Sequence, residues 1–387
     1  MSIKTIDDTF VAGAYARFPL EIKRGSGSLV WDINEKEYID MATGIAVNTF
    51  GVSDPVWAEA VTTQVNTLQH TSNLYYSEPC AKLAQMLCEK TGMKKVFFSN
   101  SGAEANECAI KVARKYAAMH HGEKRNQIIT LINSFHGRTV TTLAATGQDT
   151  FHKDFLPLTP GFLYTPANDI AAATALLERD DVAAIMMEPV QGEGGVNPLD
   201  KAFVAAVTDL AKKRDILIIT DEVQCGNGRS GQLYAYMHYG ITPDIVSTAK
   251  GLAGGLPLGA TLMGEKTKDV LTPGSHGSTF GGNPVCCAGA LSILSRLDDA
   301  LLAGVRARAD YIRSELSGAS GIRSVTGLGL MLGVETEKDA GEIIRTCMDN
   351  GVLYIKAKNK VRMLPALNIP EALLKKAIAV LKDACAI

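Results

Sequence analysis

The stretch Asp215–Gln224, DILIITDEVQ, decides the fold of this chain. Its apolar run Ile216–Ile219 is uninterrupted by polar residues, which is typical of a strand that is buried on both faces of a parallel sheet. The run ends abruptly on Thr220 and on two adjacent carboxylates, Asp221 and Glu222. Because open parallel sheets bind ligands at the carboxyl ends of their strands, the pattern predicts an α/β protein with an acid in its binding site.

Five further apolar runs alternate with helix-length segments between about residues 95 and 265. One of these segments, residues 103–119, places Ala109, Val112, Ala113 and Tyr116 on one stripe, as an amphipathic helix does. We therefore expect a mostly parallel central sheet that is covered by helices. The runs are VFFS (96–99), IITLI (128–132), AAIMM (183–187), DIVST (244–248) and ATLMG (260–264).

The pattern changes in the C-terminal part of the chain, where helices over 284–317, 337–350 and 370–384 alternate with short strands near 322–334, 352–355 and 361–364. This alternation predicts a smaller α+β domain. An antiparallel unit near the N-terminus, SLVWDINEKEYIDM with its turn at Asn34 and Glu35, is expected to join that domain. The predicted division is residues 1–50 with the small domain, 51–285 as the large ligand-binding domain, and 286–387 as the small domain.

Composition excludes several classes of function. The chain has 387 residues, of which 46% are hydrophobic, and its 39 Lys and Arg against 41 Asp and Glu give a formal net charge of -2. Without a basic excess to neutralise a phosphate backbone, nucleic acid is not expected as a partner. The apolar runs are far shorter than the roughly 20 residues that cross a bilayer, and MSIKTIDDTF does not begin a signal peptide. We expect a cytoplasmic protein without membrane contact.

Cysteine and histidine usage gives no sign of a metal site. The eight cysteines are scattered without a CxxC pair, which indicates reduced, buried thiols. No histidine lies at a metal-ligand spacing from cysteines or acids, so those considered are interpreted as turn or core residues. They are His136, His152, His238 and His276.

The segment VFFSNSGAEANECAIKVARKY, residues 96–116, is a candidate phosphate site. A strand ends in a Ser, Asn and Gly turn, and a helix begins near Ala103. The free N–H groups and the partial positive charge at a helix start attract phosphate, and Gly102 lets the backbone approach closely. The alternative is an ordinary βα connection. The segment does not match GxxxxGK[ST] or GxGxxG, which disfavours a nucleoside triphosphate or a dinucleotide.

Lys250 lies in PDIVSTAKGLAGGLPLGA, after an apolar strand and before Gly251, Gly254 and Gly255. Burial lowers the pKa of a lysine, as a Schiff-base lysine requires. A solvated surface position is the alternative for Lys250, and a helix cap is the alternative for Asp221. A strand-end acid, a phosphate site and a glycine-flanked lysine together predict pyridoxal phosphate, whose ring nitrogen an ionised Asp221 would keep protonated. We expect Glu222 to turn away toward backbone or a neighbouring side chain.

Six motifs, in one order and over nearly the full length, resemble those of the class III, or ornithine-type, pyridoxal-phosphate-dependent aminotransferases. The resemblance implies the type I fold of these transferases, with the cofactor in the large domain. The motifs are NSGAEANECAIKVAR (100–114), SFHGRT (134–139), EPVQGEGGV (188–196), DEVQCGNGRSG (221–231), DIVSTAKGLAGGLPLGA (244–260) and HGSTFGGNP (276–284).

The resemblance also implies the roles of the cofactor-binding residues. Lys250 would form the Schiff base, and Asp221 would pair with the pyridine nitrogen. In this family the cofactor phosphate is also reached by a threonine of the neighbouring subunit, which here is Thr279, so a homodimer with shared sites is implied. The remaining implied contacts are backbone N–H of Gly102 and Ala103 to phosphate, Phe135 and Val223 on the two ring faces, and Gln224 near the phenolic oxygen.

The substrate-binding residues are likewise implied by the resemblance. Arg138 and Arg362 would bind substrate carboxylates, for which a guanidinium fork is well suited. Glu193 would pair with Arg362 until glutamate displaces it, and a purely structural ion pair is the alternative interpretation. Ser278 would contact the acyl end of an acylornithine substrate.

Within the class, the motifs are most similar to those of acetylornithine enzymes. This implies transfer of the terminal amino group of N-acetylornithine to 2-oxoglutarate by a ping-pong mechanism, giving N-acetylglutamate 5-semialdehyde and glutamate in arginine biosynthesis. Gly44 stands where ornithine enzymes carry a tyrosine, which disfavours free ornithine. Cys225 and the segment GVSDP (51–55) also depart from the family pattern, at positions without a chemical role.

Several alternatives remain open at this point. The amino donor could be succinylornithine, ornithine or 4-aminobutyrate, whose enzymes share most of these motifs. A non-catalytic pyridoxal-phosphate-binding protein would bind cofactor without transferring an amino group. A mutase on the same fold would need no 2-oxoglutarate.

Overall fold

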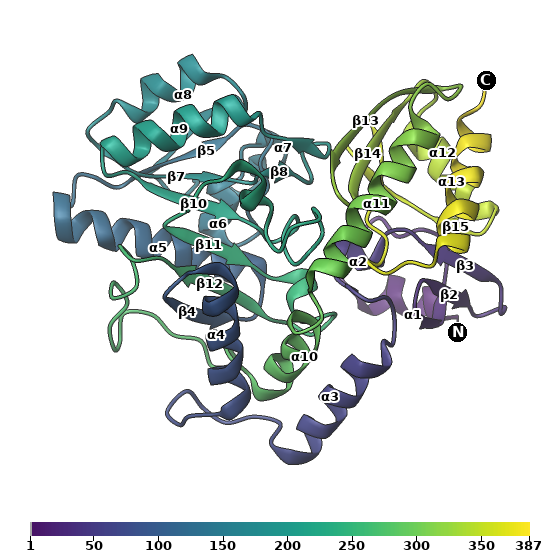
Figure 1. Ribbon diagram of the computed structural model, residues 1–387, viewed down its shortest axis with the longest axis horizontal. Coiled ribbons are helices and arrows are strands. Elements are labelled where there is room, and N and C mark those ends of the chain that lie inside the picture. Colours follow the sequence, from purple (N-terminus) through teal and green to yellow (C-terminus); the bar gives the residue numbers. More distant parts are fainter. Residues whose placement is uncertain (1) are drawn as a thin grey trace.

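The chain folds into a larger part built around one sheet and a smaller part that contains both termini (Figure 1). The structure is a computed structural model that describes residues 2–387. The larger part lies on the left in Figure 1, and the smaller part lies on the right with β13, β14 and the C-terminal helices. The limits of the domains remain a prediction.

The central sheet has seven strands in the order β4-β12-β11-β10-β7-β5-β6. Neighbouring strands from β11 to β6 run parallel, which confirms the predicted α/β class. The decisive stretch forms β10 in the centre, with every residue buried from Leu217 to Asp221. The strands are β4 (Lys95–Ser99), β5 (Gln127–Leu131), β6 (Phe162–Thr165), β7 (Val182–Met187), β10 (Leu217–Asp221), β11 (Ile245–Thr248) and β12 (Gly259–Met263).

Two strands differ from the sequence prediction. Strand β12 runs antiparallel to both β11 and β4. Only the short 3-10 turn η2 (Lys250–Leu252) lies between β11 and β12, so no helical crossover returns the chain to the same direction. Strand β6 was not predicted, because it is an edge strand whose residues Phe162–Tyr164 are not buried and therefore lack a continuous buried pattern.

Helices cover both faces of this sheet. Helix α5 (Gly102–His121) covers one face, where Ala109, Val112, Ala113 and Tyr116 are buried as their spacing predicts. Helices α8 (Ile170–Leu177) and α9 (Lys201–Lys213) lie on the other face, above β5 and β7 in Figure 1. The remaining elements of this part are α6 (Val140–Ala145), α7 (Asp149–His152), β8 (Val190–Gln191), β9 (Asn197–Pro198) and η1 (Ala235–Tyr239).

The helix predicted over 284–317 is two helices, α10 (Pro284–Leu294) and α11 (Asp299–Leu316). The side chain of Asp298 accepts a hydrogen bond from the N–H of Leu301 and thereby caps a new helix, which the apolar periodicity did not indicate. Helix α10 packs against α3 (Pro55–Thr67) and α4 (Glu78–Thr91), at the bottom of Figure 1.

The C-terminal residues form a second sheet in the order β13-β14-β17-β16, covered by helices. The short strand β15 belongs to a separate sheet, in which its Val352 pairs in parallel with Ile39 of the N-terminal hairpin. The strands are β13 (Ile322–Leu328), β14 (Met331–Thr336), β15 (Val352–Leu353), β16 (Ile355–Ala357) and β17 (Lys360–Met363), and the helices are α12 (Ala340–Asp349) and α13 (Glu371–Cys385).

The N-terminal hairpin consists of β2 (Leu29–Asp32) and β3 (Glu37–Asp40), with β1 (Ile22–Ser26) beside β2. Helix α1 (Ile3–Phe10) has no buried residue. The turn α2 (Thr43–Ala46) contains left-handed residues at Gly44 and Ile45 and leads into the central cavity through Val47.

Within residues 2–387, no helix has the length and the apolar character required to cross a membrane.

Candidate active site

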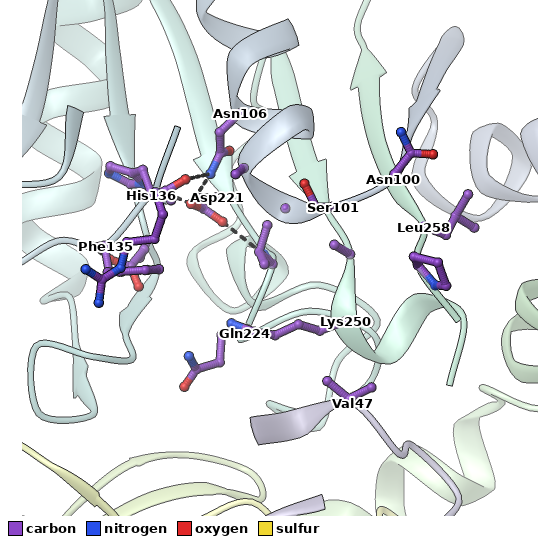
Figure 2. A pocket seen from close by; sticks show the side chains of 18 of the residues that line it. Val47, Asn100, Ser101, Asn106, Phe135, His136, Asp221, Gln224, Lys250 and Leu258 are labelled. Atoms are coloured by element: carbon purple, nitrogen blue, oxygen red, sulfur yellow. Dashed lines mark hydrogen bonds and ion pairs between the residues drawn. The ribbon is translucent and has the colours of Figure 1, made fainter. Parts of the chain in front are cut away.

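A cavity of about 430 Å³ opens at the carboxyl ends of the parallel strands (Figure 2). Several neighbouring strands contribute to it, because the segments that follow β4, β5, β7, β10 and β11 all reach this edge of the sheet. The predicted residues that line it are Gly102, Ala103, Phe135, Arg138, Asp221, Val223, Gln224 and Lys250. The structure therefore brings most of the predicted site residues together.

The carboxylate of Asp221 is buried at the end of β10, with only 3% of the residue exposed. Its Oδ2 accepts hydrogen bonds from Asn106 Nδ2 at 2.8 Å and from His136 Nδ1 at 2.7 Å. Its Oδ1 accepts from the backbone N–H of Val223 at 3.0 Å. Figure 2 shows Asn106, His136 and Asp221 gathered on one side of the cavity. These donors hold the carboxylate in one orientation.

Sequence reasoning missed the contacts of Asn106 and His136 with this acid. It assigned no role to Asn106 and treated His136 as a turn or core residue, and His136 is indeed buried. The available signal was the position of His136 beside Phe135 in SFHGRT and that of Asn106 one helical turn after Gly102. Asn106 Nδ2 also donates to the carbonyl of His136 at 2.7 Å, so the two side chains support each other.

Lys250 follows β11 and directs its side chain toward Gln224 in Figure 2. Its φ angle of 47° lies in the left-handed region, which non-glycine residues rarely adopt. Burial lowers the pKa of the Lys250 amine below its ordinary value, while the charges of Glu193 and Asp221 oppose this effect. The amine is therefore shifted toward the neutral, nucleophilic form.

The start of helix α5 presents free backbone donors to the cavity. Ser101 accepts the N–H of Glu104 at 3.1 Å, and the carboxylate of Glu104 accepts the N–H of Asn100 at 2.6 Å. Within residues 2–387, the N–H groups of Gly102 and Ala103 have no such partner. A Cβ atom on Gly102 would lie 2.5 Å from Val223 Cγ1, so glycine allows the helix start to approach that side chain.

Arg362 and Glu193 form a bidentate ion pair beside the cavity. Arg362 Nη1 donates to Glu193 Oε1 at 2.6 Å, and Nη2 donates to Oε2 at 3.3 Å. Burial raises the pKa of Glu193, but the charge and hydrogen bond of Arg362 outweigh this effect and hold the value below its ordinary range. Gln224 joins both partners, because its Oε1 accepts from Arg362 at 3.0 Å and its Nε2 donates to Glu193 at 3.3 Å.

The two glycines that flank Glu193 pack closely against neighbouring groups. A Cβ on Gly192 would lie 2.5 Å from Gln224 Oε1, and a Cβ on Gly194 would lie 2.6 Å from the carbonyl oxygen of Asn133. Glycine is required at position 194, where the neighbour is backbone, whereas at position 192 a Cβ would have to displace the end of the Gln224 side chain. The Glu193 side chain itself remains 29% exposed.

Glu188 is a second buried acid of the site, and sequence reasoning gave it no role. Its carboxylate accepts the N–H of Phe135 at 2.8 Å and the N–H of Gly192 at 3.0 Å. Burial raises the pKa of Glu188 to about 7, helped by the charge of Asp221 and opposed by His136. The acid joins the segment that carries Phe135 to the loop that carries Glu193.

Glu222 turns away from the cavity, as expected. It accepts the N–H of Ala235 at 2.8 Å and that of Tyr236 at 2.7 Å, and the thiol of Cys225 lies 3.1 Å from its Oε2. Cys225, one of the positions that depart from the family pattern, thus contacts this carboxylate.

Besides Glu193 and Arg362, two predicted residues do not line the central cavity, Ser278 and Thr279. They border a second hollow of about 660 Å³ with Phe97, Phe98 and His276. Ser278 is connected to the central cavity because its Oγ accepts from Asn100 Nδ2 at 3.1 Å. Thr279 is exposed on its own chain.

These residues fit pyridoxal phosphate. The cavity combines free N–H groups at a helix start for the phosphate, a buried carboxylate for the ring nitrogen and a lysine amine whose pKa is lowered. Phe135 and Val223 provide apolar surfaces on the cavity wall. The fold and this site define a pyridoxal-phosphate-dependent aminotransferase of the type I fold.

Comparisons with known proteins identify the family. Residues 10–385 match the family model described as aminotransferase class-III, and the chain belongs to this family. Its cofactor is pyridoxal phosphate, so the predicted fold class, enzyme class and cofactor are confirmed.

Individual relatives cover nearly the whole chain. An acetylornithine aminotransferase of Haemophilus ducreyi is 48% identical over 381 residues, which is 98% of this chain and 97% of the relative. A succinylornithine transaminase of Salmonella paratyphi A is 44% identical, with 94% of this chain and 91% of the relative covered. The crystal structure of an ornithine aminotransferase from Toxoplasma gondii superposes with a TM-score of 0.94 at 32% identity, covering 98% of this chain and 93% of the other.

We expect Glu222 to make stability depend on pH. Burial raises the pKa of Glu222 to about 7, above the value of about 4.3 in an unfolded chain. Its contribution to stability is therefore complete below the unfolded value and is lost as pH rises through about 7. Compared with wild type, Glu222→Gln should show a smaller decrease in the free energy of unfolding between about pH 5 and 8, measured by urea denaturation.

The exposed Glu337 supplies the control, because Glu337→Gln should keep the wild-type pH dependence. Equal slopes for wild type and Glu222→Gln would show that Glu222 does not titrate in this range.

Proposed function

We propose that the protein transfers the terminal amino group of N-acetylornithine to 2-oxoglutarate, in arginine biosynthesis in the cytoplasm. The observation that carries this proposal is one cavity that combines the lysine, the buried acid and the free helix N–H groups with two arginines at its margin. A pyridoxal-phosphate carrier without turnover would have no use for two carboxylate-binding arginines.

The cofactor contacts follow from these positions. When bound, pyridoxal phosphate supplies an aldehyde that condenses with amines and a ring that withdraws electrons from the substrate carbon. Asp221 would keep the ring nitrogen protonated, and the N–H groups of Gly102 and Ala103 would bind the phosphate. Phe135 and Val223 would cover the two ring faces, and Gln224 would lie near the phenolic oxygen.

Lys250 would hold the cofactor between turnovers and move the proton during them. With its Nζ free, Lys250 would act as general base toward the substrate carbon and would then return the proton as general acid. The lowered pKa of Lys250 supports this role, because a neutral amine is needed to accept the proton.

Both substrates would use the same cavity in turn, which gives ping-pong kinetics. Arg138 would bind the carboxylate of the amino donor. Arg362 would bind the α-carboxylate of glutamate or 2-oxoglutarate after Glu193 has turned away from it. The bidentate geometry of the Arg362–Glu193 pair supports this exchange, because a substrate carboxylate can accept the same two N–H groups.

The donor is assigned to N-acetylornithine on two grounds. The relatives at 44–48% identity include several acetylornithine aminotransferases. Gly44 stands where ornithine enzymes carry a tyrosine, and the absence of that side chain is expected to leave room for an acyl group on the donor. Succinylornithine is the second candidate, because a succinylornithine transaminase is 44% identical to this chain.

We further propose a homodimer with shared active sites. Thr279 is exposed outside the central cavity of its own chain, and Phe280 beside it is 60% exposed. Tyr75 and Tyr76 add further exposed aromatic surface at 71% and 105%. Exposed aromatic groups of this kind are typical of a subunit interface, through which Thr279 would reach the phosphate of the neighbouring subunit.

The donor assignment predicts a substrate order. With 2-oxoglutarate present, glutamate should form fastest from N-acetylornithine, then from N-succinylornithine, and at least about tenfold more slowly from ornithine or 4-aminobutyrate, since these lack the acyl group. The measurement is initial velocity for each donor with and without 2-oxoglutarate.

Initial velocities measured while both substrates are varied test the ping-pong mechanism. An intersecting pattern of lines in the double-reciprocal plot would contradict it.

Lys250→Ala is the control for the site in this assay. It should lose the chromophore that borohydride reduces, together with at least about 10²-fold of activity. A variant that keeps a covalent cofactor would place the linkage on another residue.

Removing the acid of the Arg362–Glu193 pair should strengthen binding of the second substrate. In Glu193→Ala, 2-oxoglutarate no longer displaces a charged hydrogen bond worth about 1.5–3 kcal/mol. We therefore expect its KM to fall by at least about tenfold, measured from steady-state kinetics at saturating donor. The exposed Glu337→Ala serves as matched control. An unchanged KM for 2-oxoglutarate would favour a purely structural ion pair.

Shared sites predict recovery of activity in mixed dimers. A Thr279→Glu subunit keeps Lys250 but repels the phosphate of its neighbour, and a Lys250→Ala subunit keeps Thr279. Dimers mixed from the two inactive variants contain one intact site, so activity should rise well above that of either parent after subunit exchange. If each site were built from a single chain, no mixture would recover activity.

A further inference from the structure

Arg138 and Phe151 face each other at the margin of the cavity. The guanidinium carbon of Arg138 lies 4.2 Å from the centroid of the Phe151 ring and 5.5 Å from that of Phe135. The two rings meet edge to face, with centroids 5.7 Å apart and planes at 78°. Arg138 thus contacts aromatic surface from two segments, the loop after β5 and helix α7.

Arg138 has no polar partner among residues 2–387. Neither a hydrogen bond nor an ion pair joins its guanidinium to another described residue, and the residue is exposed. An arginine side chain loses about 2 kcal/mol of rotamer entropy when it is fixed. A cation–π contact at an exposed site contributes about 0.5–1 kcal/mol, which offsets part of this loss and leaves every N–H donor free.

Helix α7 is fixed relative to the loop that carries Arg138. His152 Nε2 bonds to the carbonyl oxygens of Leu143 at 2.9 Å and Thr146 at 2.7 Å. Gln148 Nε2 donates to the carbonyl of Ser134 at 3.0 Å. Both His152 and Gln148 are buried. The Phe151 ring therefore has a defined position from which it can orient the guanidinium.

We propose that Phe151 is a positioning residue that holds Arg138 ready for the carboxylate of the amino donor. Phe151 does not line the central cavity, so it acts through Arg138. The inference rests on the proposed function, in which Arg138 binds that carboxylate. It adds that preference for donors with this carboxylate depends on the aromatic ring at position 151.

The test compares two donors that differ only in the carboxylate, N-acetylornithine and its decarboxylated analogue N-acetylputrescine. Phe151→Leu should lower kcat/KM for N-acetylornithine by about two- to fivefold, the factor that corresponds to a cation–π contact. The value of kcat/KM for N-acetylputrescine should not change in Phe151→Leu, and Phe151→Tyr should keep wild-type kinetics with both donors. Phe155→Leu is the matched control, because Phe155 follows on the same segment and is 63% exposed.

A binding measurement separates positioning from a general effect on turnover. N-acetylnorvaline lacks the reacting amine but keeps the carboxylate, so calorimetry reports its dissociation constant without catalysis. Phe151→Leu should weaken this binding by about two- to fivefold when Arg138 is present and leave it unchanged in the Arg138→Met background. If Phe151→Leu proves poorly folded by its melting curve, Phe151→Met replaces it in the same cycle.

The inference is overturned if both donors lose equally, if neither donor is affected, or if the effects of Phe151 and Arg138 add independently. Failure of the proposed function gives a different result, because the wild-type protein would then form no glutamate from N-acetylornithine. The calorimetric comparison of wild type with Phe151→Leu would still test whether Phe151 positions Arg138.

Discussion

The buried carboxylate of Asp221 is the constraint on which the site depends. An ionised acid removed from water costs several kcal/mol unless donors surround it. Here the donors are the amide of Asn106, the imidazole of His136 and the N–H of Val223. They come from helix α5, from the segment after β5 and from the turn after β10. Satisfying one carboxylate therefore fixes three elements relative to one another.

Glu188 imposes a similar constraint one layer further out. Because it accepts N–H groups from Phe135 and Gly192, the segment of the aromatic ring and the loop of Glu193 share one acceptor. The two acids act on connected segments, since Phe135 and His136 are neighbours. The segment that carries Phe135 and His136 and the loop that carries Glu193 are thereby joined in one hydrogen-bond network.

Much of the fold could be predicted from the sequence because the decisive signals are local. The uninterrupted apolar runs around β10 indicate strands that are buried on both faces. The glycines after Lys250 indicate a backbone turn at the end of a strand, which is not typical of a surface lysine. The direction of individual strands and the positions of helix breaks were less predictable. The antiparallel course of β12 depends on the absence of a crossover helix, and the break before α11 depends on one capping side chain, Asp298.

Within the site, the sequence predicted residues whose neighbours are distinctive, and it missed residues whose partners are distant in the chain. His136 bonds to an acid 85 positions away, and Asn106 bonds to the same acid across 115 positions. Periodicity cannot report such pairings, because they arise only when α5 and the segment after β5 come together at the end of β10. Arg362 and Glu193 were found through the family resemblance alone, since they too are far apart, by 169 positions.

In the proposed function Arg362 exchanges Glu193 for a substrate carboxylate, and the packing of Gly194 beside Glu193 bears on how this exchange takes place. Gly194 lies against the carbonyl oxygen of Asn133, whereas the Glu193 side chain is 29% exposed, so rotation about its χ torsions can release Arg362 without a change in the backbone. Such rotations take on the order of picoseconds to nanoseconds, far less than hinge motions. Alternation between the two ligands of one catalytic cycle would then proceed without a kinetic delay from backbone rearrangement at this loop.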